Sequence, residues 1–167
     1  LMQLPAIREA GALGLERHMA DGNPNCPGRD RVERFYHVDL RDRDALLETA
    51  RSIPNLRGVF TAGTDFSTSV AWITDRLELP GTPYDACLAA TDKGRMRTVL
   101  KENGIRVPDF RVFTADDRDS LGTVTLPVVV KPVDSMGARG VVHVKTAERL
   151  YEAFDDAIAK AADLAGV

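Results

Sequence analysis

A lysine at the end of an apolar run is the residue in this chain best suited to bind an anion. Residues 126–131 read LPVVVK, and segment 132–140 after them contains Gly137, Arg139 and Gly140. Glycine lets backbone N–H groups turn toward an anion and approach it closely, and Lys131 would add a positive charge there. The pattern indicates an anion site, although a glycine-containing hairpin turn with a solvated lysine explains the same residues.

A second group of cations lies near the start of a predicted helix at residues 92–103. Lys93, Arg95 and Arg97 fall within its first two turns, where a cation opposes the helix dipole at a cost of ~0.3 to 1 kcal/mol. A bound polyphosphate would offset that cost, and a solvated face partly balanced by Asp92 is the alternative. The phosphate-loop patterns GxxxxGK[ST] and GxGxxG are both absent.

Strand and helix patterns alternate in the first half of the chain. This alternation predicts a parallel sheet with right-handed crossovers, in a Rossmann-like arrangement. The predicted helices are 3–13, 42–53 and 66–78, and the predicted strands are 17–20, 35–38 and 58–62. Because the first element is a helix, we expect the central first strand to be missing from the sequence given.

The pattern changes near residue 90, where we expect a domain boundary. Thr91 is the expected cap of helix 92–103, which stops at Asn103 and Gly104. The β-branched runs at 126–131 and 140–144 predict a hairpin with a long tip. The remaining expected elements are a strand at 111–113, a polar loop at 115–123 and an amphipathic helix at 147–164.

The composition is that of an ordinary globular protein and excludes several classes. The 167 residues carry 22 Lys and Arg against 25 Asp and Glu, which argues against nucleic-acid binding through bulk charge. The two cysteines form no metal or disulfide pattern, so we expect no metal site within the chain. Without an apolar run long enough for a bilayer or a signal peptide, we expect no membrane association and a cytoplasmic location.

Two further segments contain candidate ligand contacts. Gly63, Thr64, Asp65 and Ser67 lie at a predicted strand-to-helix turn, where open α/β sheets collect ligands, although a helix cap explains Thr64 or Asp65 equally well. Asp21 follows the predicted strand 17–20, where a dinucleotide fold binds a ribose hydroxyl, and a turn before Gly22 is the alternative.

In order and spacing, these motifs resemble the ATP-grasp superfamily over nearly the whole chain. The likeness is carried by Thr91-Asp92-Lys93, by Lys131 at its strand end and by the loop 135–140. It is closest to carbamoyl phosphate synthetase large chains, biotin carboxylases and phosphoribosylglycinamide synthetases. Segments 4–7, 21–25 and 61–65 resemble the pre-ATP-grasp domain of these enzymes. The implied α/β fold is a Rossmann-like pre-ATP-grasp sheet at 1–90, followed at 91–167 by the first α+β subdomain of an incomplete ATP-grasp module.

The resemblance also implies roles for particular residues. Lys93 and Lys131 match the two lysines that bind the nucleotide phosphates. The mobile loop over the β- and γ-phosphates matches Ser135, Met136, Gly137, Ala138, Arg139 and Gly140. Having fewer glycines than biotin carboxylase, this loop is expected to be stiffer.

The implied parent activity is ATP-dependent carboxylate–amine ligation. ATP converts a small-molecule carboxylate into an acylphosphate, which an amine attacks, releasing ADP and phosphate. The Mg²⁺ ligands and the catalytic arginine are expected beyond Val167, so we expect this chain alone to be inactive. We also expect that the chain can form a homo-oligomer.

Two other functions stay open at the level of sequence. One is an NAD(P)-binding oxidoreductase domain that uses Asp21, and the other is a catalytically silent nucleotide-sensing or assembly domain. The predicted hairpin ending in Lys131 favours the ligase, because a dinucleotide fold has no need of it.

Overall fold

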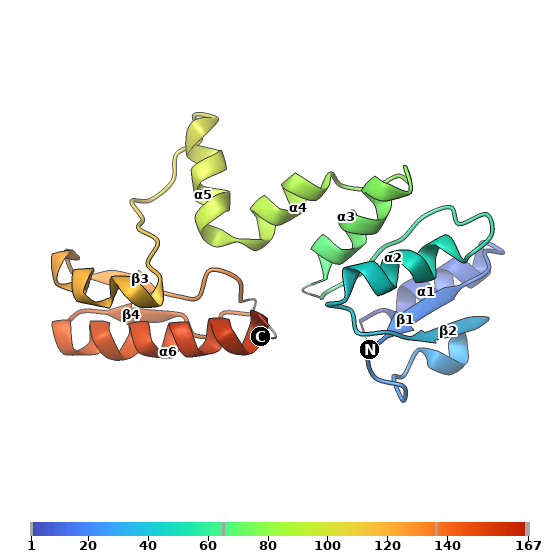
Figure 1. The fold of residues 1–167 in the computed structure, drawn as a ribbon, viewed down its shortest axis with the longest axis horizontal. Helices are drawn as coiled ribbons and strands as arrows, with labels where there is room; N and C mark the ends of the chain where they lie inside the picture. The colour runs from blue at the N-terminus through green and yellow to red at the C-terminus, as the bar shows by residue number, and fades with distance from the viewer. Residues whose placement is uncertain (1, 65, 136, 166–167) are drawn as a thin grey trace. The chain divides into compact units, whose positions relative to one another are not determined.

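The computed structural model describes residues 2–64, 66–135 and 137–165, and the chain divides into two compact units. The first unit runs from Leu1 to Cys87 and the second from Leu88 to Val167. Figure 1 shows the elements of each unit along the chain. None of the described helices combines the length and apolar character that crossing a membrane requires.

The first unit begins with alternating helices and strands, as predicted. Its elements are α1 (Leu4–Ala12), β1 (His18–Asp21), η1 (Arg29–Arg31), β2 (Arg34–His37), α2 (Arg43–Arg51) and α3 (Ser67–Arg76), and α4 (Tyr84–Thr91) contains the boundary. β1 and β2 pair in parallel, with His18 opposite Arg34. The predicted parallel sheet is therefore confirmed for these two strands.

The core of the first unit forms where α2 packs against α3. Asp42 caps α2 by accepting a hydrogen bond from Ala45 N at 2.9 Å, which satisfies a backbone donor in its first turn. The buried apolar side chains of this core are Leu46, Leu47, Ala50 and Ile73.

The predicted strand at 58–62 is wrong, because this segment has no ladder partner among the described residues. The Gln3 side chain binds it instead, donating to Ala62 O at 3.0 Å and accepting from Ala62 N at 3.2 Å. A β-branched run becomes a strand only where a neighbouring strand can pair with its backbone. Here an amide side chain satisfies part of that backbone.

A hairpin and a long helix form the second unit. Its elements after α4 are α5 (Lys93–Glu102), η2 (Ala115–Thr123), β3 (Val128–Val130), β4 (Val142–Val144) and α6 (Ala147–Ala165). β3 and β4 pair antiparallel, and α6 contacts both strands and η2, as Figure 1 shows. The buried core consists of Leu121, Val144, Leu150, Ala153 and Phe154. The predicted hairpin and amphipathic helix are both confirmed.

Three local predictions for the second unit are wrong. Residues 111–113 form no strand, and 115–123 form the 3₁₀ helix η2 in place of a loop. Thr114 and Asp117 make a reciprocal capping box, which starts η2. The cap of α5 is Asp92 in place of Thr91, because the Asp92 carboxylate accepts from Arg95 N at 2.7 Å.

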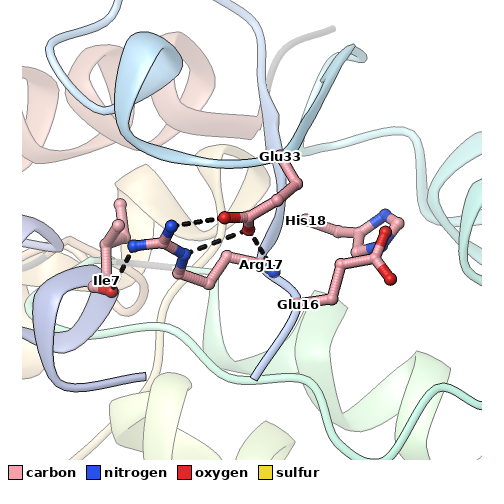
Figure 2. A network of polar contacts seen from close by, with 5 residues as sticks. All are labelled: Ile7, Glu16, Arg17, His18 and Glu33. Atoms are coloured by element: carbon pink, nitrogen blue, oxygen red, sulfur yellow. Dashed lines mark hydrogen bonds and ion pairs between the residues drawn. The ribbon is translucent and has the colours of Figure 1, made fainter. Parts of the chain in front are cut away.

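An arginine–glutamate pair joins the starts of β1 and β2 (Figure 2). Glu33 Oε2 accepts from Arg17 N at 2.7 Å and from Arg17 Nε at 3.0 Å, while Glu33 Oε1 pairs with Arg17 Nη2. The same guanidinium donates to Ile7 O of α1 at 3.5 Å. A Cβ atom at Gly11 would lie 2.4 Å from Arg17 Nη1, so a side chain at this position would require the guanidinium to shift.

The Arg17–Glu33 pair makes an acid-sensitive contribution to stability. The hydrogen bonds from the side chain and backbone of Arg17 lower the pKa of Glu33 from 4.5 to about 2. A carboxyl group whose pKa is lower in the folded than in the unfolded chain stabilises the fold at pH values above its pKa in the unfolded chain. This contribution is lost as the pH falls toward its pKa in the folded chain. We expect Glu33→Gln to lower the urea midpoint of unfolding at pH 7. Near pH 2, the midpoint of the variant should approach that of the parent chain.

Asp30→Asn is the matched control for that measurement. Asp30 is exposed and has no ion pair among the described residues. Its replacement should leave the difference between the midpoints at pH 7 and pH 2 unchanged. A Glu33→Gln variant whose midpoint differs from the parent by the same amount at both pH values would contradict the prediction.

Candidate functional site

The start of α5 lies against the loop that follows β3. Lys93, the first residue of α5, donates its backbone N–H to Val133 O at 2.9 Å. Asp92 satisfies the N–H of Arg95 in the same turn. Two backbone N–H donors at the start of this helix are therefore bonded within the chain, one of them to the loop after β3.

The Lys93 side chain joins the same loop. Its ammonium donates to Val133 O at 3.1 Å and to Ser135 O. Lys131 is half-buried directly after β3, two positions before Val133. Lys93, Lys131 and the loop, which the sequence analysis grouped by resemblance, thus belong to one region of the second unit.

The loop has an unusual backbone. Gly137, Ala138 and Gly140 have φ angles of 66°, 58° and 71°, and such left-handed backbone costs a residue with a side chain about 1 to 2 kcal/mol. A Cβ atom at Gly140 would lie 3.0 Å from the Pro132 ring, so a side chain there would also crowd this ring. The left-handed backbone of the loop therefore includes Ala138 as well as two glycines.

Other predicted loop residues divide into buried and exposed positions. Ser135 is buried, and its hydroxyl donates to Arg139 O at 2.9 Å, so this hydroxyl closes the loop. The Arg139 side chain is exposed. Met136 lies outside the described residues.

Two residues near the loop were missed by the sequence analysis. Lys160 of α6 passes so close to Gly140 that a Cβ there would lie 3.0 Å from its Cδ. Asp134 Oδ1 is buried without a hydrogen-bond partner among the described residues. Asp134 could have been noticed between the lysine and the glycines, whereas only the packing of α6 on the hairpin reveals Lys160.

The predicted substrate contacts belong to the first unit. Gly63 has a φ of 65°, and Thr64 Oγ1 lies 2.6 Å from Thr61 Oγ1. Ser67 begins α3, whose cap is Phe66, so Thr64 is not the cap of this helix. Asp65 lies outside the described residues.

Asp21 has the turn role that the sequence analysis considered for it. Its Oδ1 atom accepts from Asn23 N at 2.8 Å across Gly22. This carboxylate oxygen shapes the turn after β1.

The described residues contain no cluster of side chains typical of a metal site. Within 2–64, 66–135 and 137–165, no three His, Cys, Asp or Glu side chains lie close enough to hold a metal ion. The arrangement of Lys93, Lys131 and the loop suits an anion, because lysine supplies charge and N–H donors without accepting hydrogen bonds.

Comparison with proteins of known sequence identifies the superfamily. A putative D-alanine–D-lactate ligase from Streptomyces coelicolor is 36% identical over 110 residues, which cover 63% of this chain and 30% of that protein. The carbamoyl phosphate synthase large chain of Neisseria meningitidis is 28% identical over 160 residues, or 92% of this chain and 14% of its own length. No protein-family model matches the chain.

Solved structures agree with these sequence relatives. The L-amino acid ligase of Bacillus licheniformis superposes with a TM-score of 0.75 at 29% identity, over 90% of this chain and 38% of that one. The chain belongs to the ATP-grasp superfamily. The predicted resemblance is confirmed, and the D-alanyl ligases add a group that the sequence analysis did not name.

The fold is also shared with a more distant member. The biotin carboxylase domain of the Hydrogenobacter thermophilus 2-oxoglutarate carboxylase, solved with MgADP, has a TM-score of 0.74 at 15% identity, over 99% of this chain and 40% of that one. At this identity the likeness concerns the fold alone. This ATP-grasp chain spans 25 to 30% of the length of the first curated relatives it matches.

Proposed function

We propose that this chain is the ATP-binding part of an ATP-dependent carboxylate–amine ligase, and that Lys93, Lys131 and the loop 135–140 bind the nucleotide phosphates. The observation that carries the proposal is the pair of bonds from the Lys93 ammonium to the loop that follows Lys131. They bring two cations that are far apart in sequence to one loop of an ATP-grasp fold. The corresponding domains are 1–90 and 91–167.

The residues of this site suit the binding of a polyphosphate. Lys131 brings an ammonium to the end of β3, and Arg139 is exposed in the loop that follows. Charge-assisted hydrogen bonds to phosphate oxygens are each worth roughly 1.5 to 3 kcal/mol. Backbone N–H groups at Gly137 and Gly140 add donors where the chain turns left-handed.

In the proposed reaction, the chain orients ATP while its γ-phosphoryl group is transferred to a small-molecule carboxylate. The carboxylate oxygen forms a bond to phosphorus, and the bond to the ADP oxygen breaks. An amine then attacks the acylphosphate carbon and releases phosphate. Cations around the transferred group offset its charge, as in other phosphoryl transfers.

The proposal extends to the carboxylate substrate and to the cellular location. Gly63, Thr64 and Ser67 are proposed carboxylate-substrate contacts, because they lie in the turn and helix start that precede the body of α3. The proposed setting is the cytoplasm, where ATP is abundant.

Calorimetric titration of the whole chain with ATP and with NADH tests the proposed function. ATP should bind, with affinity falling from ATP to ADP to AMP as phosphates are removed, and NADH should bind more weakly than ATP. Binding of NADH more tightly than ATP would overturn the proposal in favour of a dinucleotide-binding domain. Equal affinity for ATP and AMP would overturn the assignment of the site to phosphates.

A further inference from the structure

The Lys93 ammonium is bonded to the chain's own backbone on both sides of Asp134. Val133 O accepts from the backbone N–H of Lys93 at 2.9 Å and from its ammonium at 3.1 Å. Ser135 O accepts from the same ammonium. One residue of α5 therefore holds two carbonyl groups of the loop, through bonds that a charged donor makes stronger.

The loop needs such bonds to keep its shape. Ala138 is left-handed between Gly137 and Gly140, and a backbone of this kind persists where its surroundings hold it in place. Bonds inside the loop, such as Ser135 Oγ to Arg139 O at 2.9 Å, close its tip. The bonds from Lys93 tie the base of the loop to a different element, α5.

We propose that Lys93 is a positioning residue that sets the conformation of the loop 133–140 before a nucleotide arrives. This inference deepens the proposed function and rests on it where the nucleotide is concerned. A loop that is ordered in advance reduces the entropy that phosphate binding must overcome. Lys93 then contributes to affinity through the loop as well as through its charge.

Trypsin cleavage after Arg139 measures the order of this loop without any nucleotide. Arg139 is exposed at the loop tip, so local opening makes the bond between Arg139 and Gly140 available to the protease. Lys93→Met keeps most of the side chain and removes the ammonium. In the nucleotide-free whole chain, we expect this variant to be cleaved after Arg139 roughly tenfold faster or more.

Lys101→Met is the matched control, because Lys101 is an exposed lysine in the last turn of the same helix. It should be cleaved after Arg139 at the parent rate. Lys93→Gln removes the same ammonium and is judged by the same criterion if thermal unfolding shows that Lys93→Met does not fold. Cleavage of the folded Lys93 variant at the parent rate would overturn the positioning role.

ATP titration of the same proteins separates this inference from the proposed function. Faster cleavage of the Lys93 variant in a chain that fails to bind ATP would support the positioning role and overturn the nucleotide site. Unchanged cleavage in a chain that binds ATP would overturn the positioning role and leave the nucleotide site supported.

Discussion

Lys131→Ala is expected to weaken ATP binding by roughly ten- to a hundredfold. Lys131 places an ammonium at the end of β3, directly before the loop that Lys93 holds. Losing one charge-assisted contact with a phosphate removes roughly 1.5 to 3 kcal/mol, and each 1.4 kcal/mol is about tenfold in affinity. Calorimetry with ATP gives the dissociation constant of each variant.

Lys145→Ala is the matched control for Lys131→Ala. Lys145 directly follows β4 as Lys131 follows β3, and the antiparallel pairing places these two strand ends at opposite ends of the hairpin. The Lys145 variant should bind ATP with the affinity of the parent chain. Equal losses of affinity in the two variants would indicate a general effect of charge and contradict a specific role for Lys131.

Phe154→Ala is expected to destabilise the second unit by about 3 to 5 kcal/mol. Phe154 of α6 is 6% exposed and packs in the core with Leu121, Val144 and Leu150. Truncating it removes transfer energy and leaves a cavity between α6 and the hairpin that presents the loop. Urea unfolding, followed by a probe in the second unit, measures the loss.

Phe60→Ala supplies the comparison for Phe154→Ala, because Phe60 is the same residue type and is 62% exposed. Its replacement should change the free energy of unfolding by no more than about 0.5 kcal/mol. Comparable losses from the two substitutions would show that the packing of α6 does not support the hairpin as described.

Elements that depend on local sequence were predictable. The β-branched run before Lys131 predicted β3, and the spacing of Leu150 and Phe154 predicted the buried face of α6. The strand predicted at 58–62 failed because a strand also needs a partner, and here Gln3 bonds part of the segment. The helix η2 was missed because the polar residues 115–120 are typical of a loop, although the capping box of Thr114 and Asp117 is a local signal for a helix start.

The sequence predicted which residues form the candidate site, but it did not predict the contacts that these residues make. The resemblance singled out Lys93 and Lys131, but the bonds from Lys93 to carbonyl groups forty positions away arise from tertiary packing. The approach of Lys160 to Gly140 likewise depends on how α6 lies against the hairpin. A sequence pattern names side chains with suitable chemistry, and the fold decides which backbone groups they meet.

Hydrogen exchange of the whole chain, measured with and without saturating ATP, tests the central claim most directly. The account predicts that ATP slows the exchange of backbone amides in the loop 133–141 and at the start of α5. Slower exchange confined to the turn at 61–67, or exchange in the loop that saturating ATP leaves unchanged, would contradict it.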